Sequence, residues 1–313
     1  MTRPLVSVIV PTYNCAAFVR SAIDSVLAQS YAPIEVVVVD DGSTDETLAV
    51  LSGFGERIRV FSQSNAGPAA ARNRAVAQAH GEYLAFLDGD DLWLPGHLEG
   101  LMQHLVAHPE VKVAFADWLV WHADADGTYP PIDIAPGTLQ LDPATSGWLY
   151  TRLLFDSVIH IIACVIHRSV YETVNGFDEA LRTGSDYDFW LKVSRRYPVA
   201  KLQGLVAVYR QNPQSVTYRL RAEDNAYRLL NRAIAAYGIS DDAGNRVDPS
   251  AIAARLAHLS FVHGYRHFWD GDPGIATRSF LLALRHRPMH GKALLYLLAS
   301  AGKRAGRAFT TRQ

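Results

Sequence analysis

The segment IEVVVVDDGSTDET, residues 34–47, determines the fold class of this chain. Its apolar run is continuous rather than alternating, which is typical of a strand covered on both faces. The run stops at two aspartates, and Ser43 with Glu46 three residues later has the spacing of a capping box that opens a helix. The segment therefore predicts a buried strand, a polar loop and a crossover helix.

The same order of strand, polar loop and helix recurs along the first hundred residues. Further strand-like runs are VSVIV (6–10), RIRVFS (57–62) and YLAFLD (83–88), with helical patterns over 18–27 and from Pro68 onward. Strands that alternate with helices in this way form right-handed crossovers and a parallel sheet. We therefore predict an α/β fold with a Rossmann-like, mostly parallel sheet flanked by helices.

The rest of the chain divides into an irregular middle and a helical end. Further strands are predicted at 111–122, 158–169 and 200–211. From about residue 217 the pattern is helical to the end, without strand signals. We expect one α/β domain over residues 1–216, with a nucleotide-binding half over about 1–110 and an acceptor half over about 111–216. An all-helical C-terminal region would follow over 217–313.

The composition is that of an ordinary globular protein. The 313 residues are 49% hydrophobic and carry a net charge of −1, which leaves no basic excess for a nucleic-acid partner. Cys15 and Cys164 have neither metal-ligand spacing nor a disulfide framework, so we expect a reducing, cytoplasmic compartment. The apolar runs are too short for a membrane-spanning helix or a secretory signal, and neither is expected.

Polar clusters follow each of the first four predicted strands. They are PTYN (11–14), DDGSTD (40–45), QSNAGPAAARN (63–73) and DGDD (88–91). Taken singly, Asn14 could be a helix N-cap, and the paired aspartates of the second cluster could be turn formers. Because ligands bind outside the carboxyl ends of the strands in such a sheet, the four clusters together predict one ligand site.

Asp88, Asp90 and Asp91 crowd three carboxylates into four positions. Like charges this close repel, so a divalent cation or a network of loop amides must offset the repulsion. Neither a glycine-rich dinucleotide motif nor a Walker loop is present. Arg72 for phosphate and the carboxylates for a hard cation are typical of a nucleoside diphosphate bound with Mg²⁺ or Mn²⁺.

Several motifs, in order, resemble the inverting glycosyltransferases of family 2, which have the GT-A fold. They are VSVIVPTYN, VVVVDDGSTDET, NAGPAAARNRA, GEYLAFLDGDD and GFDEALRTGSDYDFWLKV, and they cover about residues 4–212. The resemblance implies transfer of one sugar from a nucleoside-diphosphate sugar, with UDP-sugars favoured, to a glycan or lipid-linked acceptor in cell-surface polysaccharide biosynthesis. No QxxRW-type segment is present, which argues against processive polymerisation.

The resemblance also implies roles for individual residues. Asp91 and Asp90 would hold Mn²⁺ or Mg²⁺. Asp186 would be the catalytic base that takes the proton from the attacking hydroxyl. The nucleotide sugar would be bound by Pro11, Tyr13, Asn14, Asp41, Asn65, Gly67, Arg72 and Asp90, with the Asp41 carboxylate accepting from the base.

Some positions stay open. Asp88 is explained as well by a structural role with loop amides as by a metal role. Asp186 and Asp188 could merely supply charge to a helix N-terminus; the resemblance favours catalysis for Asp186 and leaves Asp188 open. Two residues depart from the family's pattern: Ser185 replaces a frequent glutamate, and Asn212 stands where many members have a histidine that assists the metal.

Two other functions also remain open. The LDGDD segment could be the nucleophile loop of an aspartyl phosphoryl-transfer enzyme, although that motif usually follows the first strand. The chain could also be an inactive scaffold in an envelope glycan complex. Beyond Asp272 the chain has eight Lys and Arg residues and no acidic residue. Such an end suits peripheral contact with an anionic membrane at its inner face, or a solvated helix face with a tail.

Aromatic residues and histidines give weaker signals. Five tryptophans could stack on a sugar ring, namely Trp93, Trp118, Trp121, Trp148 and Trp190, but most of them are expected in the core. Trp148, after a Gly/Pro loop, is the best candidate for contact with an acceptor. The histidines, among them His160, show no metal-ligand spacing and are expected to be structural or exposed.

Overall fold

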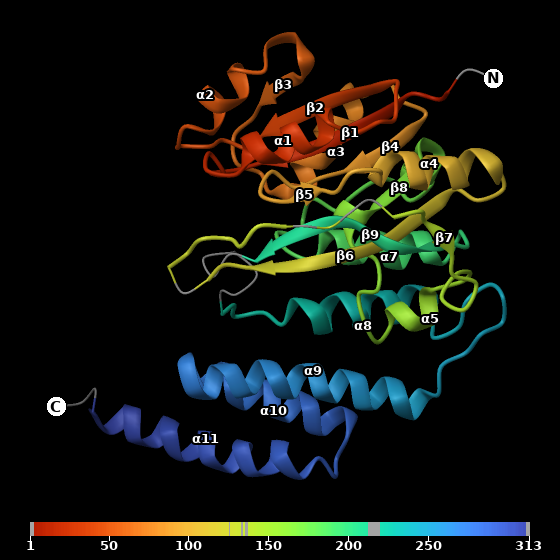
Figure 1. Ribbon diagram of the computed structural model, residues 1–313. Helices are drawn as coiled ribbons and strands as arrows, with labels where there is room; N and C mark the ends of the chain where they lie inside the picture. Colours follow the sequence, from red (N-terminus) through yellow and green to blue (C-terminus); the bar gives the residue numbers. More distant parts are fainter. Residues whose placement is uncertain (1–2, 125, 133, 135–136, 212–219, 311–313) are drawn as a thin grey trace. The chain divides into compact units, whose positions relative to one another are not determined.

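The computed structural model describes residues 3–124, 126–132, 134, 137–211 and 220–310 (Figure 1). The chain forms two compact units. The first comprises Met1–Leu153 and Ser157–Pro213, and the second Leu154–Asp156 and Gln214–Gln313.

The first unit is built on one sheet. Within the described residues its strands are β1 (Val6–Thr12), β2 (Ile34–Asp40), β3 (Arg59–Ser62), β4 (Tyr83–Phe86), β5 (Leu92–Trp93), β6 (Val113–His122), β7 (Gln140–Leu141), β8 (Cys164–His167) and β9 (Ala200–Gln211). Their order is β3-β2-β1-β4-β8-β6-β9-β5, and β7 pairs with β9. The predicted α/β class is confirmed.

The strands β3, β2, β1 and β4 form the parallel half that the sequence predicts. Every residue of β1 is buried, as are Val36–Val39 of β2, because the sheet has helices against it. Continuous apolar runs therefore mark these strands correctly. The third strand starts two residues later than predicted, since Gly55–Arg57 form a short 3₁₀ helix.

The second half of the sheet is mixed rather than parallel. β8 lies antiparallel between β4 and β6, while β6 and β9 are parallel to each other. The strand predicted over 158–169 is wrong in length, because Ile161–Ala163 form a 3₁₀ helix and only Cys164–His167 pair. Residues Ile161 to Ile166 are all buried, so their apolar run reflects burial as much as strand formation.

Helices flank this sheet. They are α1 (Val19–Leu27), α2 (Thr47–Ser52), α3 (Pro68–Gln78), α4 (His97–Ala107), α5 (Tyr150–Leu153), α6 (Arg168–Thr173) and α7 (Ser185–Ser194). The capping box predicted at Ser43 is wrong, because its hydroxyl donates to Asp40 instead. α2 begins at Thr47, whose backbone N–H donates to Asp45 Oδ1 at 3.0 Å. The helix that begins at Pro68 is confirmed.

The second unit is helical, as predicted. It contains α8 (Asn225–Tyr237), α9 (Pro249–Asp270), α10 (Pro273–His286) and α11 (Gly291–Thr310). Aspartate side chains accept from the first-turn amides of α8, α9 and α10. Phe268, Ala276 and Phe280 form its buried core. Among the described helices, none has the length and apolar character needed to cross a membrane.

Candidate active site

The loop that carries the acidic cluster is fastened to the end of β1. The backbone N–H of Gly89 donates to Pro11 O at 3.2 Å. A Cβ at Gly89 would lie 2.8 Å from Thr12 Cγ2 and 2.9 Å from Cys15 Sγ, closer than side chains pack. Glycine is therefore the residue that lets the loop lie against β1, and this contact fixes the acids at the carboxyl edge of the parallel strands.

Asp91 is the most deeply buried of the three acids, with 1% of its surface exposed. Its Oδ1 accepts from the backbone N–H of Arg210 at 2.7 Å. Its Oδ2 is buried and has no hydrogen-bond partner in the described part of the chain. Burial, with the charges of Asp90 and Asp88, raises the pKa of Asp91 well above its usual range. A buried oxygen without a partner is costly, and a bound cation is one group that would offset this cost.

Arg210 braces the same loop from β9. Its Nη1 donates to Asp90 O at 2.9 Å. Its guanidinium lies 4.4–5.1 Å from the centres of the rings of Phe18, Trp121 and Tyr129. Burial, together with the charge of Asp88, raises the pKa of Asp90 to about 6. The structure thus places Arg210 against Asp90 and Asp91, a role that the sequence alone does not assign to it.

Asp88 forms an ion pair with Arg72. The distance from Asp88 Oδ1 to Arg72 Nη2 is 2.5 Å. Arg72 extends from α3, is buried, and leaves its Nε without a partner among the described residues. The pair favours a structural role for Asp88 over direct metal binding. Arg72 in turn lies close enough to Asp186 for that carboxylate's charge to act on it.

Asp186 and Asp188 both lie in the first turn of α7, which follows Gly184 with φ of +74°. Asp188 is buried and pairs with Lys192 at 2.7 Å within its own helix. The carboxylate of Asp186 is partly exposed and receives no hydrogen bond from the described residues. Its charge acts on Arg72 and on His160. The two acids therefore differ: Asp188 is buried and paired within its own helix, whereas the carboxylate of Asp186 is partly exposed.

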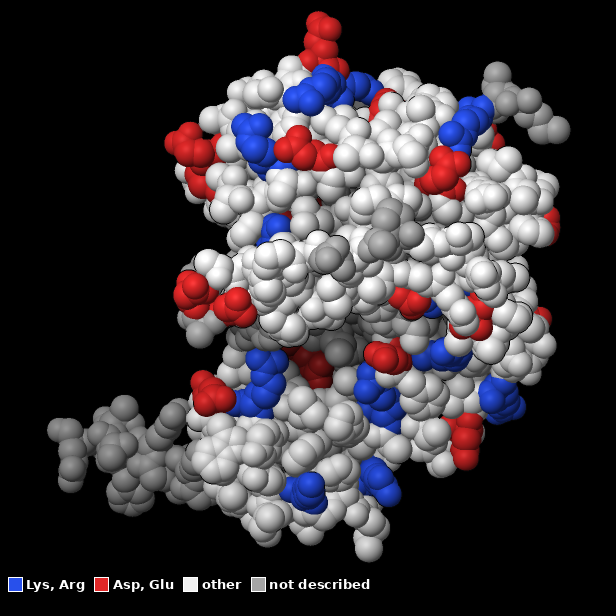
Figure 2. Space-filling model, viewed as in Figure 1, with Lys and Arg blue, Asp and Glu red and all other residues white. Residues whose placement is uncertain are grey.

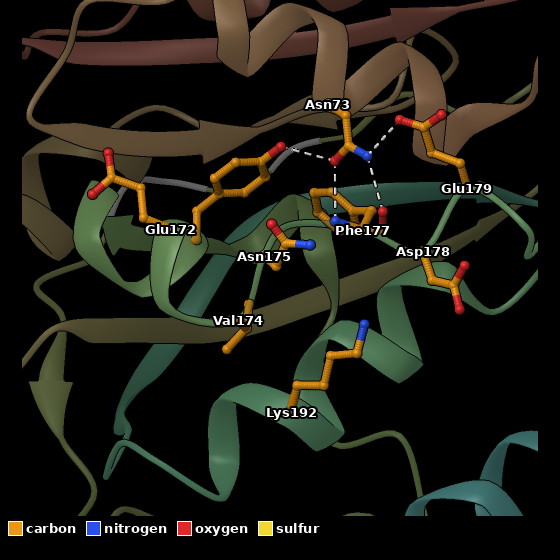
Figure 3. Close-up of a pocket in the computed structure, with 9 residues that line it drawn as sticks. Asn73, Glu172, Val174, Asn175, Phe177, Asp178, Glu179 and Lys192 are labelled. Carbon is orange, nitrogen blue, oxygen red and sulfur yellow. Dashed lines mark hydrogen bonds between the residues drawn. The ribbon is translucent and has the colours of Figure 1, made fainter.

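Asn73 ties α3 to the segment that leads into α7 (Figure 3). Its Nδ2 donates to Phe177 O at 2.9 Å and to Glu179 Oε1 at 2.8 Å. Its Oδ1 accepts from the backbone N–H of Phe177 at 3.0 Å and from the Tyr171 hydroxyl at 2.8 Å. These side chains border a surface pocket of about 740 Å³. The network holds α7 at a set position relative to the neighbouring Arg72.

Asn14 connects the ends of β1 and β2. It has a φ of +48°, and its Oδ1 accepts from the backbone N–H of Thr44 at 2.8 Å. Its own N–H donates to Ser43 Oγ at 2.9 Å. The N-cap of α1 is Phe18, so the alternative in which Asn14 caps that helix is wrong. Beside it, Tyr13 is 49% exposed.

Asp41 organises the loop between β3 and α3. Its side chain is buried. The Oδ1 atom accepts from Gln63 Nε2 and from the N–H of Ala66, both at 2.8 Å. The Oδ2 atom accepts from the N–H of Gly67 at 2.7 Å. Both oxygens are therefore engaged within the protein. Asn65 on the same loop accepts from Arg182 Nη1 at 3.2 Å.

The structure thus brings the predicted acids into one cluster. Asp88, Asp90, Asp91 and Asp186 lie within electrostatic reach of Arg72 or Arg210. Pro11, Tyr13, Asn14 and Asp41 lie at the carboxyl ends of the neighbouring strands β1 and β2. Ser185 is buried beside the base candidate. Asn212 lies outside the described residues.

Comparisons with known proteins agree with this picture. The sequence model of Glycosyl transferase family 2 matches residues 7–118. The chain is 35% identical over 204 residues to an uncharacterized glycosyltransferase of Rickettsia felis. The matched region covers 63% of the chain and 32% of that relative. The chain therefore spans about a third of that relative's length. The chain is 30% identical over 295 residues to the succinoglycan biosynthesis protein ExoU of Rhizobium meliloti. The matched region covers 90% of the chain and 83% of ExoU.

Two solved structures share the fold. S. aureus TarS 1-349 in complex with UDP-GlcNAc has a TM-score of 0.66 at 19% identity and covers 96% of this chain and 92% of that one. The mannosyltransferase PcManGT of Pyrobaculum calidifontis, in complex with GDP-Man and Mn2+, has a TM-score of 0.58 at 22% identity. The match covers 99% of this chain and 84% of that one. At these identities the likeness shows the fold, which is GT-A. With the family match and the similarity to ExoU, it follows that the chain belongs to glycosyltransferase family 2.

Proposed function

We propose that this protein transfers one sugar from a nucleoside-diphosphate sugar to a hydroxyl of a glycan or lipid-linked acceptor, with inversion at the anomeric carbon. The observation that carries the proposal is the buried, unpartnered Oδ2 of Asp91 together with the carboxylate of Asp186, since the charges of both acids act on the buried Arg72. Family membership supports glycosyl transfer, and the name of ExoU supports polysaccharide biosynthesis. The UDP-GlcNAc complex of TarS supports UDP-sugars as the favoured donors.

The acidic cluster fits a Mn²⁺ or Mg²⁺ ion. In the described part of the chain, no three His, Cys, Asp or Glu side chains converge to form a complete metal site. Asp91 Oδ2 with the neighbouring Asp90 is the set expected for a cation whose other ligands are diphosphate oxygens and water. When bound, such an ion neutralises the charge that develops on the departing diphosphate.

Asp186 would act as the base on the acceptor side. The acceptor hydroxyl gives its proton to the Asp186 carboxylate while its oxygen forms a bond to the anomeric carbon. The bond from that carbon to the diphosphate oxygen breaks, and the electron pair leaves with the nucleoside diphosphate. Attack from the face opposite the leaving group inverts the anomeric configuration. Arg72, buried beside Asp88, supplies a fixed positive charge near the phosphates.

The contacts of Asp88 and Asp91 argue against the two alternatives, which are an aspartyl phosphoryl-transfer enzyme and an inactive scaffold. Asp88 is tied to Arg72, and Asp91 is sequestered against β9, so neither carboxylate is placed as an exposed nucleophile for phosphoryl transfer. A buried carboxylate oxygen without a partner costs stability, and in an inactive scaffold nothing would offset that cost. We further propose residues 1–216 as the transferase domain, with nucleotide-binding and acceptor halves that meet near residue 110, and 217–313 as its helical extension.

A donor screen tests this function. The full chain is incubated with UDP-glucose, UDP-galactose, UDP-GlcNAc and GDP-mannose in the presence of Mn²⁺, and release of nucleoside diphosphate is measured. We expect turnover of at least one UDP-sugar and its loss on addition of EDTA. If none of the donors is bound or hydrolysed, the transferase proposal fails. Turnover that EDTA leaves unchanged would refute the metal assignment alone.

We also propose that α10 and α11 contact the inner face of the membrane, where a lipid-linked acceptor would lie, from a cytoplasmic location. Leu294, Leu295 and Leu298 of α11 are 51–68% exposed, an unusual apolar stripe for a solvated helix. α10, α11 and the turn between them also carry exposed cations: Arg278, Arg285, Arg287 and Lys292. The lowest part of the face in Figure 2, where Figure 1 shows α11, carries Lys and Arg among uncharged side chains. Apolar and basic groups together are typical of helices that lie on anionic lipid.

Vesicle sedimentation tests the membrane contact. The full chain is expected to bind vesicles that contain anionic lipid more strongly than neutral ones. Exchange of Leu295 and Leu298 together for serine should weaken binding by about tenfold or more, since burial of each leucine contributes about 1.5–3 kcal/mol. Val106→Ser, at a valine of the first unit that is 49% exposed, is the matched control. Equal recovery of the wild type in the soluble fraction with both lipids would contradict the proposed membrane contact.

A further inference from the structure

The β6–β9 ribbon carries aromatic side chains on both faces, and the site described above uses only one of them. Trp121 pairs with Arg210 in the register, and both lie on the face toward the acidic loop. Val120 pairs with Tyr209, so Tyr209 lies on the opposite face. Because side chains alternate along a strand, Trp118 shares that second face with Val120 and Tyr209.

His160 completes an aromatic cluster on this second face. Its ring centre lies 5.2 Å from that of Trp118 and 5.0 Å from that of Tyr209. All three side chains are partly exposed, unlike the core residues Trp93 and Trp190, which are buried. The sequence leaves Trp118 open between core packing and contact with a sugar ring. The structure sets it, half-buried, in one cluster with His160.

The imidazole of His160 has unused hydrogen-bonding capacity. Its Nδ1 is buried and lacks a partner among the residues that the structure describes. Burial lowers the pKa of His160, while the charges of Asp186 and Asp88 oppose this shift and that of Arg72 adds to it. Burial therefore favours the neutral imidazole, and the ring lies near enough to Asp186 for the charge of that carboxylate to act on it. A neutral imidazole offers one donor and one acceptor, which matches a sugar hydroxyl that can both accept and donate.

We propose that Trp118, His160 and Tyr209 form the subsite for the acceptor sugar. The aromatic faces would pack against the apolar C–H face of a pyranose ring. The imidazole would hydrogen-bond to a hydroxyl of the same ring, next to the hydroxyl that Asp186 deprotonates. The ligand class is a terminal hexopyranosyl residue of a glycan or glycolipid. This inference rests on the proposed function, because it takes Asp186 as the base.

Two features argue against a purely structural cluster. A packing cluster on a sheet face would bury its rings fully, as Phe115, Phe189 and Trp190 are buried in this unit. The cluster also holds an unpartnered ring nitrogen, as do the fully buried His97 and Trp190, but here the rings that surround it are partly exposed. A ligand hydroxyl that meets the imidazole accounts for the unpartnered nitrogen, and ring exposure leaves a surface for the sugar.

Binding of simple glycosides tests the subsite. The full chain, saturated with UDP and Mn²⁺, is titrated with the methyl β-glycosides of glucose, galactose, N-acetylglucosamine and mannose, followed by saturation-transfer NMR. We expect at least one glycoside to bind. Loss of the indole in Trp118→Ala should weaken its binding by about tenfold or more, whereas Trp118→Phe, which keeps a ring, should stay within about threefold. His160→Phe should weaken binding although it preserves ring packing, since it removes the hydrogen bonds.

Controls separate this inference from the proposed function. UDP affinity reports the donor side, and it should stay at the wild-type level in the Trp118 and His160 variants. Trp269→Ala, at a tryptophan of the second unit that is 56% exposed, is the inert control. Trp148→Ala tests the alternative acceptor contact.

Several outcomes would overturn the subsite. They are failure of the wild type to bind any glycoside, unchanged binding by Trp118→Ala, and loss of binding in Trp148→Ala alone. Loss of UDP affinity in Trp118→Ala would also count against it, since the residue would then act structurally. Absence of UDP binding and donor turnover in the wild type would instead refute the proposed function.

Discussion

Replacement of Asp186 by asparagine is expected to lower the rate of sugar transfer by about 10²–10⁴-fold, the usual contribution of a general base. Asparagine has the same shape but cannot take the proton of the acceptor hydroxyl. Because the described residues give the Asp186 carboxylate no hydrogen bond, the exchange removes only its charge, which acts on Arg72 and His160. UDP affinity should therefore stay within about twofold of the wild type, and the loss should appear in kcat rather than in KM for the donor. Transfer kinetics and UDP titration measure the two quantities.

Asp188→Asn is the matched control, because Asp188 lies in the same helical turn. Its carboxylate is buried and pairs with Lys192, so the exchange should lower the melting temperature and reduce transfer by less than about tenfold. Loss of either first-turn charge weakens the favourable interaction with the helix dipole by only about 0.3–1 kcal/mol. Equal losses of activity in the two variants, each with a lower melting temperature, would show that both acids are structural and that the base lies elsewhere.

Asp91→Asn is expected to have opposite effects on metal binding and on the stability of the metal-free protein. Second-sphere partners alone change metal affinity by about 10–100-fold, so loss of a direct carboxylate ligand should weaken Mn²⁺ binding by about 100-fold or more. The metal-free protein should become more stable near neutral pH, since the buried charge is removed while Oδ1 still accepts from Arg210 N. Mn²⁺ titration in the presence of UDP and thermal melting in EDTA measure these effects.

The raised pKa values of Asp90 and Asp91 make the stability of the metal-free protein depend on pH. A carboxyl whose folded-state pKa is raised opposes folding once pH exceeds its unfolded pKa, because folding then requires proton uptake or burial of the charge. The pKa of Asp91 is raised, and that of Asp90 is raised to about 6. In EDTA, the wild type should lose stability as pH rises from about 4 toward 8 through these two groups, and Asp91→Asn should lose less.

Asp88→Asn is the control for the metal assignment. Asp88 pairs with the buried Arg72, so its loss leaves a buried cation without its partner and should destabilise the protein with and without metal. Mn²⁺ affinity should fall much less than in Asp91→Asn. If Asp88→Asn loses more Mn²⁺ affinity than Asp91→Asn does, the roles of the two acids are reversed.

The parts of the fold that local patterns encode could be predicted from the sequence. β1, β2 and β9, the helix that begins at Pro68 and the break between α9 and α10 follow from apolar runs, prolines and glycines. The mixed half of the sheet could not, because nothing in a short apolar run states which strand it pairs with or in which direction. The short 3₁₀ helix before β8 is hidden for the same reason: full burial makes extended and helical segments equally apolar.

Local signals also fail where two groups compete for one partner. Ser43 has the spacing of a helix cap, but Asp40 three residues earlier takes its hydroxyl. In the site, the acids of the DGDD loop could be found because the ends of parallel strands converge. Arg210 and His160 could not, since each acts on residues far away in the chain and neither stands in a pattern of its own. Such partners become visible only when the sheet is assembled.

The hydrogen bond from Arg210 N to Asp91 has a consequence for how the molecule acquires its site. It joins residues 119 positions apart, and the bond from Asn73 to Phe177 joins residues 104 apart. Contacts of such sequence separation close large loops, and loop closure is slow and entropically costly. The acidic loop can therefore receive this hydrogen bond only once β9 is in place. A nascent chain that ends before β9 holds every carboxylate of the cluster and still lacks the site.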